Sequence, residues 1–94
     1  MKVENMTLSN GNKIANQFVI WDDNRDRFFQ SYSSIIAKVS FDPKTCKRTV
    51  TLDEKDWDYS KTTGKYRNQF LGETKKETEK KIKSGVYILA DLNS

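Results

Sequence analysis

The chain has 94 residues, of which 35% are hydrophobic, 12% aromatic and 32% charged, and its formal net charge is +4. This length predicts a single domain, residues 1–94, and the aromatic content excludes an intrinsically disordered chain because aromatic side chains supply most of the buriable area. There is no histidine and only one cysteine, Cys46, which excludes an intramolecular disulfide and removes the commonest general base and metal ligand.

Neither a targeting segment nor a membrane span is expected. The start, MKVENMTLSNG, is too polar for the core of a signal peptide. No stretch approaches the ~18 apolar residues that a membrane-spanning helix needs. We therefore expect no membrane association and, with a single cysteine, a reducing, cytoplasmic setting.

The first half of the chain has the alternation and the turn residues of β-strands. The runs VENMTL (3–8) and NKIANQFVIW (12–21) flank Asn10 and Gly11, which form a strong hairpin signal because both residues tolerate positive φ. The run RFFQSYSSIIAKVSF (27–41) predicts either one long strand or two short ones, broken at Ser33-Ser34. Next, DPKTCK predicts a turn and RTVTLD an alternating strand.

In the second half the residue pattern changes to that of helices. Ser60, Thr62 or Thr63 would cap a first helix through GKYRNQFL, and Gly72 would end it. The sequence TKKE, starting at Thr74, is a capping box that predicts a second helix ending before glycine 85. The final run, VYILADL, predicts a last strand.

The predicted order of elements is β-β-β-β-α-α-β. It corresponds to an α+β fold, in which a small, twisted, mainly antiparallel sheet of about five strands carries two short helices before the last strand.

The sequence offers little for catalysis. A nucleophilic serine or cysteine needs a base, and with histidine absent we interpret Cys46 as an ordinary turn residue. The acidic runs DDNRDRFF and DEKDWDY lack the glycine and the closing glutamate of a calcium loop, so no metal site is expected. TTGKY lacks the first glycine and the Ser/Thr of a P-loop. We therefore expect neither an enzyme nor a cofactor.

Positive charge is concentrated in one quarter of the chain. Residues 1–60 contain nine Lys/Arg and nine Asp/Glu, whereas residues 61–83 contain eight Lys/Arg against three Glu. A partner attracted by charge is therefore expected at the helical segment. The candidate binding residues are its aromatic and basic side chains: Trp57, Tyr59, Lys61, Lys65, Tyr66, Arg67, Lys75, Lys76, Lys80 and Lys81.

Two interpretations of these residues stay open. Trp, Tyr and Arg often dominate interface energy, and lysines beside exposed rings also suit nucleic acid. Alternatively, Trp57 and Tyr66 belong to the core that a small sheet needs. The lysines would then be solvated, with Lys81 and Lys83 spaced for i,i+4 ion pairs to glutamates 77 and 79.

Five phrases of the sequence together resemble one known family: KIANQF, FFQSYSSIIA, WDYSKTTGKYRNQFLG, KKETEKKIKSG and LADLN. The family consists of small, functionally uncharacterised proteins found mainly in tailed-bacteriophage genomes, and the similarity extends from Lys13 onward. The resemblance implies no activity, cofactor or catalytic residue. It implies expression in the cytoplasm of an infected bacterium, and phage accessory proteins of this size generally act by stoichiometric binding.

The residues and the resemblance together predict a non-enzymatic, phage-encoded accessory protein that binds a host macromolecule as an inhibitor or adaptor. We expect the partner to be a host protein, and nucleic-acid binding through residues 61–83 is the alternative. A homo-oligomer is a further alternative, because the exposed edge strands of a small sheet can pair between subunits.

Overall fold

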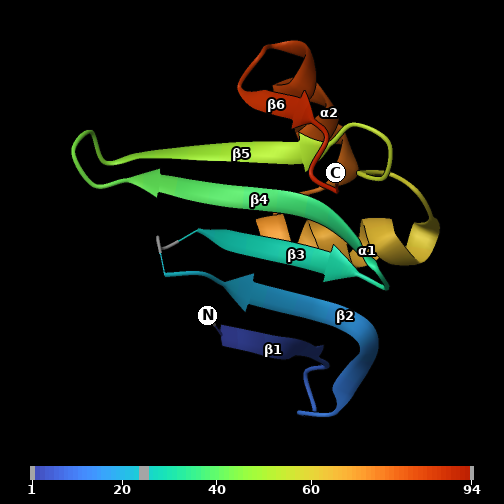
Figure 1. Ribbon diagram of the computed structural model, residues 1–94. Coiled ribbons are helices and arrows are strands. Elements are labelled where there is room, and N and C mark those ends of the chain that lie inside the picture. The colour runs from blue at the N-terminus through green and yellow to red at the C-terminus, as the bar shows by residue number, and fades with distance from the viewer. Residues whose placement is uncertain (1, 24–25, 94) are drawn as a thin grey trace.

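The structure is a computed structural model that describes residues 2–23 and 26–93. Its elements follow one another as β1 (Lys2–Thr7), β2 (Lys13–Trp21), β3 (Arg27–Ser31), β4 (Ser34–Asp42), β5 (Lys47–Asp53), α1 (Lys61–Leu71), α2 (Lys75–Lys83) and β6 (Tyr87–Ala90) (Figure 1). The six strands form one sheet in the order β1-β2-β3-β4-β5-β6. Neighbouring strands are antiparallel except β5 and β6, which are parallel because both helices lie in the connection between them.

This arrangement confirms the predicted α+β fold, with both helices before the last strand. There are six strands because the run 27–41 forms two of them. Tyr32 and Ser33 make the turn between β3 and β4, so the break falls one residue before the predicted one. Tyr32 has a φ of +56°, and its N–H donates a hydrogen bond of 2.7 Å to the carbonyl oxygen of Asn16. The predicted turn at Gly11, which has a φ of +87°, is also confirmed.

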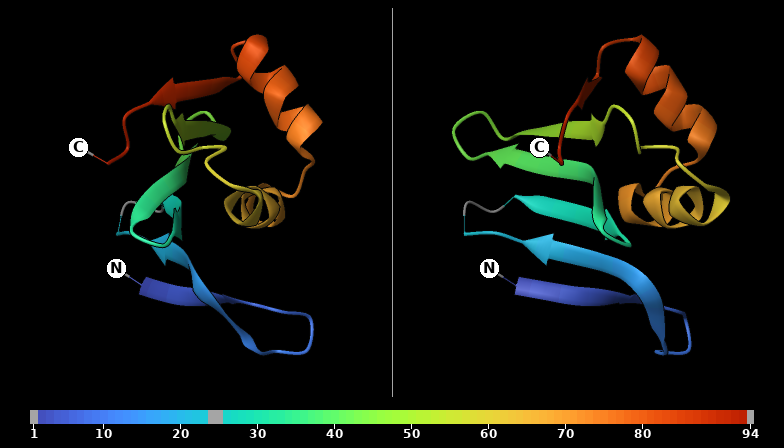
Figure 2. Two further views of the ribbon diagram at one scale, coloured as in Figure 1. Left: turned by 90° about the vertical axis from the view of Figure 1, so that its right-hand side faces the viewer. Right: turned by 45° about the vertical axis from the view of Figure 1, so that its right-hand side comes forward.

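Both helices lie on one face of the sheet (Figure 2). The ring of Phe70 in α1 stacks on that of Phe29 in β3, with 5.7 Å between centroids, and the Thr63 hydroxyl lies 2.9 Å from that of Ser31. These contacts orient every second residue of β3 toward α1. The buried apolar core lies between the sheet and the helices and consists of Met6, Ile14, Phe29, Ile36, Ala37, Val39, Val50, Leu52, Leu71 and Tyr87.

The ends of the helices are formed by the residues that the sequence singled out. Ser60 caps α1, accepting a hydrogen bond of 3.1 Å from the backbone N–H of Thr63, and Gly72 ends the helix with a φ of +72°. Thr74 and Glu77 form the predicted capping box at the start of α2. Of the three candidate caps of α1, the structure therefore confirms Ser60, and not Thr62 or Thr63.

The segment between β5 and α1 is fixed by Asp53, whose side chain is almost fully buried. Its carboxylate accepts hydrogen bonds from the backbone N–H groups of Asp56 (2.8 Å), Leu92 (2.9 Å) and Lys55 (3.2 Å). Burial alone would raise the pKa of Asp53, but these hydrogen bonds outweigh it, so the pKa lies below its ordinary value. Asp53 thereby positions the loop that carries Trp57 and Asp58.

Among residues 2–23 and 26–93, the structure has no helix long and apolar enough to cross a bilayer.

Candidate functional site

Two adjoining hollows lie where the loop before α1 meets the starts of α1 and α2, and we call them together the α1–α2 groove. The larger, of about 520 Å³, is lined by the first turn of α1, including Lys61, Gly64 and Lys65. The smaller, of about 260 Å³, has Trp57, Glu79, Ile82 and Lys83 in its wall. Asp58 and Lys75 line both hollows and therefore stand where the two join. The groove thus gathers five of the ten candidate residues: Trp57, Lys61, Lys65, Arg67 and Lys75.

Arg67 forms part of the floor of this groove, and its side chain is fully buried. Its Nη1 donates hydrogen bonds to the carbonyl oxygen of Trp57 (2.6 Å) and to Asp58 Oδ1 (3.2 Å), and its Nη2 donates to Asn68 Oδ1 (3.0 Å). The guanidinium also lies 5.1 Å from the centre of the Trp57 indole ring. The expectation that Arg67 is exposed to a partner is therefore wrong: its Nη1 holds the preceding loop against α1, and its buried Nε has no hydrogen-bond partner among the described residues.

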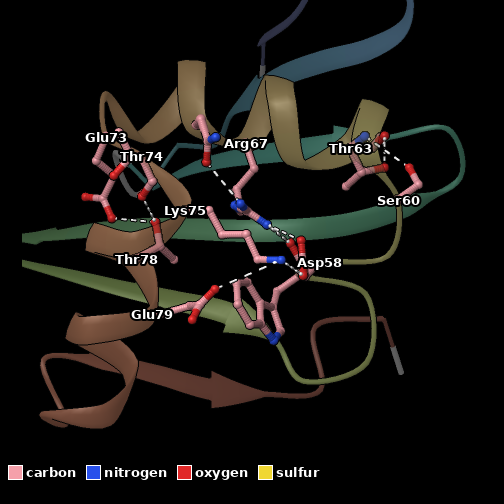
Figure 3. Close-up of polar contacts among 12 residues, drawn as sticks. Asp58, Ser60, Thr63, Arg67, Glu73, Thr74, Lys75, Thr78 and Glu79 are labelled. Carbon is pink, nitrogen blue, oxygen red and sulfur yellow. Dashed lines mark hydrogen bonds and ion pairs between the residues drawn. The ribbon is translucent and has the colours of Figure 1, made fainter.

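Lys75, the first residue of α2, joins this helix to the loop before α1 (Figure 3). Its ammonium lies 2.8 Å from Asp58 Oδ2 and 4.0 Å from Glu79 Oε1. The pKa of Asp58 lies below its ordinary value, because the hydrogen bonds from Lys75 and Arg67 outweigh the effect of burial, and the pKa of Lys75 is raised by the same carboxylate. The centre of the groove is therefore an ion pair with both signs of charge.

The aromatic candidates divide between core and surface. Trp57 and Tyr66 are half-buried and pack against the core, which supports the core interpretation for both, although Trp57 still lines the smaller hollow. Tyr59 is 62% exposed, making it the aromatic candidate most available to a partner. The Lys65 ammonium lies 5.4 Å from the centre of the Tyr66 ring.

The remaining candidate lysines of α2 lie outside the groove. Lys76 and Lys80 are exposed, whereas Lys81 lies on the other side of the helix with its ammonium 2.8 Å from Glu73 Oε1. The i,i+4 spacing predicted a different partner for Lys81, namely Glu77. Glu77 instead turns back to the cap of α2, where its carboxylate accepts a hydrogen bond of 3.2 Å from the backbone N–H of Thr74.

Glu73 was not singled out by the sequence, yet it joins α2 to the last strand. Its carboxylate accepts hydrogen bonds from Thr78 Oγ1 (2.6 Å), Lys81 Nζ (2.8 Å) and Tyr87 Oη (2.5 Å), and its side chain is only 5% exposed. Burial would raise the pKa of Glu73, but these three donors hold it below its ordinary value. One signal for Glu73 was present in the sequence: it is the single residue between Gly72, which ends α1, and Thr74, which caps α2.

Glu73 also lines a third hollow of about 310 Å³, together with Glu77. Both carboxylates already accept hydrogen bonds. Glu73 accepts one from Tyr87 Oη, and Glu77 accepts one from the backbone N–H of Thr74 at the start of α2. Within the part of the chain that the structure describes, no group of three or more Cys, Asp or Glu side chains could hold a metal ion.

The first turn of α1 runs against the usual preferences of a helix. Lys61 stands at the first helical position, where a positive charge opposes the helix dipole, and no acidic residue stands in that turn of α1. Gly64 follows, although a Cβ there would meet its nearest neighbours, Asp58 and Arg67, at ordinary distances of 3.6–3.8 Å. Alanine would favour the helix more. The helix α2 also begins with two lysines, Lys75 and Lys76, but its first turn contains Glu77, and Lys75 is paired with Asp58. The unfavourable residues of α1 all line the groove.

The fold and the groove define a small α+β domain with an open six-stranded sheet and a groove of mixed charge on its helical side. The chain belongs to a family described as "Family of unknown function (DUF8033)", whose model matches residues 1–85. This agrees with the expectation of a family without an assigned activity. No match was found among curated proteins or solved structures.

Proposed function

We propose that this chain is a non-enzymatic, phage-encoded accessory protein that acts in the host cytoplasm by binding a host protein through the α1–α2 groove. The observation that carries the proposal is the first turn of α1. Lys61 opposes the helix dipole and Gly64 lowers the helix propensity, whereas Lys65 follows the first turn with its ammonium 5.4 Å from the centre of the Tyr66 ring. Residues that break a local rule without a structural gain are expected at functional sites.

The charges of the groove favour a protein segment over nucleic acid. Four lysines line it (Lys61, Lys65, Lys75 and Lys83), but the carboxylates of Asp58 and Glu79 lie among them. A carboxylate repels every phosphate of a nucleic-acid backbone, whereas a protein segment can present acidic, basic and apolar side chains in turn. The half-buried Trp57 and Ile82 supply the apolar wall that such a segment also needs.

The proposal is tested by affinity capture from a host lysate, with and without nuclease. Lys61 and Lys65 are both exposed, so Lys61→Glu with Lys65→Glu reverses two groove charges, and the one contact it removes among the described residues is that of the Lys65 ammonium with the Tyr66 ring. The matched control is Lys13→Glu with Lys44→Glu, which makes the same change at two exposed sites on the sheet side. We expect the wild type and the control to retain one host protein after nuclease treatment, and the groove variant to lose it. Equal capture by both variants would contradict the proposal.

Nucleic-acid binding is the second candidate, favoured by the exposed Lys76 and Lys80 on α2 and by the exposed ring of Tyr59. A gel shift with generic DNA and RNA at low and at physiological salt separates the two candidates. A polyanion contact weakens steeply with salt, with a log–log slope of about one per phosphate neutralised. A shift at low salt that disappears at physiological salt would favour this candidate; we expect no shift at either.

A further inference from the structure

The two hollows of the α1–α2 groove differ in charge. Four cationic side chains line the larger hollow against the one carboxylate of Asp58: Lys61, Lys65, Arg67 and Lys75. The smaller hollow has two lysines and two carboxylates in its wall, so its charges balance. The groove therefore has a cationic end and a neutral end, which meet at Asp58 and Lys75.

The carboxylate of the larger hollow is already paired within the fold (Figure 3). Asp58 Oδ1 accepts a hydrogen bond of 3.2 Å from Arg67 Nη1, and Asp58 Oδ2 lies 2.8 Å from the Lys75 ammonium. By contrast, neither Lys61 nor Lys65 forms an ion pair within the described chain. The larger hollow therefore keeps positive charge that the fold itself does not offset.

The uncharged polar side chains of the larger hollow also have their acceptors in use. Ser60 Oγ accepts a hydrogen bond from the Thr63 N–H, and Asn68 Oδ1 accepts one from Arg67 Nη2. The Ser60 hydroxyl and the Asn68 amide N–H groups donate no hydrogen bond among the described residues. The hollow therefore offers donors to a ligand, and an ionised carboxylate is a ligand that only accepts.

Lys61 and Lys65 are placed to bind the same acidic group. They stand at positions i and i+4 of α1, where two like charges repel each other and destabilise the helix. Both side chains are exposed, and the Cβ atoms of residues at this spacing are about 5–6 Å apart. A carboxylate between the two ammonium groups removes the repulsion and accepts from both.

The smaller hollow offers an apolar contact instead of a net charge. Trp57 and Ile82 are half-buried, pack against the core and still line this hollow. The ammonium of Lys75 lies 4.0 Å from Glu79 Oε1, so the charges nearest to the apolar wall offset each other. A large apolar side chain of a partner gains there by leaving water.

We infer that the α1–α2 groove binds an acidic segment of its protein partner, in which carboxylate side chains stand next to a large apolar side chain. Lys61 and Lys65 bind the carboxylates in the larger hollow, and Trp57 and Ile82 contact the apolar side chain in the smaller one. Charge complementarity selects this occupant, because the cationic end repels a basic segment and gives a neutral one nothing to pair with. The inference rests on the proposed function, since it names the chemistry of the segment that the groove takes.

The test is an NMR titration of the isotope-labelled full chain with three peptides of about eight residues. The first contains two adjacent glutamates followed by two leucines, the second has glutamine for each glutamate, and the third has serine for each leucine. We expect the first to bind with a Kd below about 1 mM and to shift the amide signals of Lys61 and Lys65 and the indole N–H of Trp57. We expect the other two to bind at least about fivefold more weakly, because each lacks one of the two contacts.

The variant Lys61→Gln with Lys65→Gln removes the two unpaired charges of the groove. We expect it to bind the glutamate and glutamine peptides equally. The matched control is Lys76→Gln with Lys80→Gln, which removes an equally spaced and equally exposed pair of lysines from α2, outside the groove. We expect the control to prefer the glutamate peptide as the wild type does.

Several results would overturn the inference: no shift with any peptide up to about 5 mM, no preference for glutamate, or shifts outside the groove. A single-stranded oligonucleotide that shifts the same signals at equal or lower concentration would overturn it too, in favour of nucleic acid. The proposed function fails separately. A host protein captured through the groove without a preference for acidic peptides contradicts only this inference, whereas acidic peptides bound without any captured host protein contradict only the proposed function.

Discussion

At the scale of single residues, Arg67 stabilises the helical half from the inside. Its guanidinium joins the loop before α1 to the helix through the Trp57 carbonyl and Asp58, and it is fully buried. Among the described residues Arg67 Nε has no hydrogen-bond partner. Removing the side chain would leave the Trp57 carbonyl oxygen without its donor, whereas Asp58 would keep Lys75. Arg67 therefore contributes to the groove by fixing the position of Trp57 and Asp58, which line it.

We predict that Arg67→Ala lowers the free energy of unfolding by about 1–3 kcal/mol, the cost of leaving a buried acceptor, here the Trp57 carbonyl oxygen, without its donor. Urea unfolding followed by tryptophan fluorescence measures this change, because Trp57 lies against the guanidinium. A loss below about 1 kcal/mol, typical of an exposed ion pair, would show that Arg67 is not buried as described.

Glu73 gives the fold an acid-sensitive contact. Its pKa is lowered from an ordinary 4.5, so its carboxylate stabilises the fold above that pH, and this contribution is lost as pH falls through the lower, folded-state pKa. We predict that Glu73→Gln costs about 1–3 kcal/mol at pH 7, because the hydrogen bonds to a buried charge are lost.

The check is the free energy of unfolding of wild type and variant at several pH values between 7 and 3. The difference between the two proteins should shrink as the pH falls below 4.5, since the wild-type carboxyl then becomes protonated as well. A difference that is the same at every pH would mean that the charge of Glu73 contributes nothing.

At the scale of elements, the two helices differ in how the positive charge at their starts is offset. The sequence predicts the caps of both, since Ser60 and the Thr74–Glu77 box act locally. Both helices begin with lysine, but α2 has Glu77 in its first turn and Asp58 beside Lys75, whereas the first turn of α1 contains no acidic residue. The first turn of α1 is therefore the less favourable of the two, and its residues Lys61 and Gly64 line the groove.

We predict that Lys61→Glu stabilises the protein by about 0.3–1 kcal/mol, because a carboxylate at the start of α1 favours the helix dipole. Lys80→Glu makes the same change of charge in the last turn of α2, so it should destabilise by a similar amount. Thermal or urea unfolding of the two variants provides the comparison. A destabilising Lys61→Glu would mean that this lysine contributes to the fold, and the functional interpretation of the turn would fail.

The sequence predicted those features whose interacting residues are close neighbours in the chain, and it missed those whose partners are farther away. Strand alternation, the Gly11 turn and the helix caps are local, and they were predicted. The burial of Arg67 and the contacts of Glu73 were not, because their partners lie 9–10 and 5–14 residues away and meet only in the folded chain. Local spacing therefore assigned Lys81 to the wrong glutamate.

At the scale of the whole molecule, both helices lie on one side of the sheet (Figure 2). The α1–α2 groove, with its four lysines and two carboxylates, is formed by residues of these helices and of the loop before α1. The positive charge concentrated in residues 61–83 therefore lies on the side of the sheet that carries the two helices.

The central claim is that the groove binds a host protein through Lys61 and Lys65. Its most direct test is the affinity of the captured partner for three proteins: wild type, Lys61→Glu with Lys65→Glu, and the control Lys13→Glu with Lys44→Glu. We predict that the groove variant binds at least tenfold more weakly, a loss of about 1.4 kcal/mol, and that the control binds like the wild type. If both variants lose affinity equally, or if neither does, the groove is not the binding site.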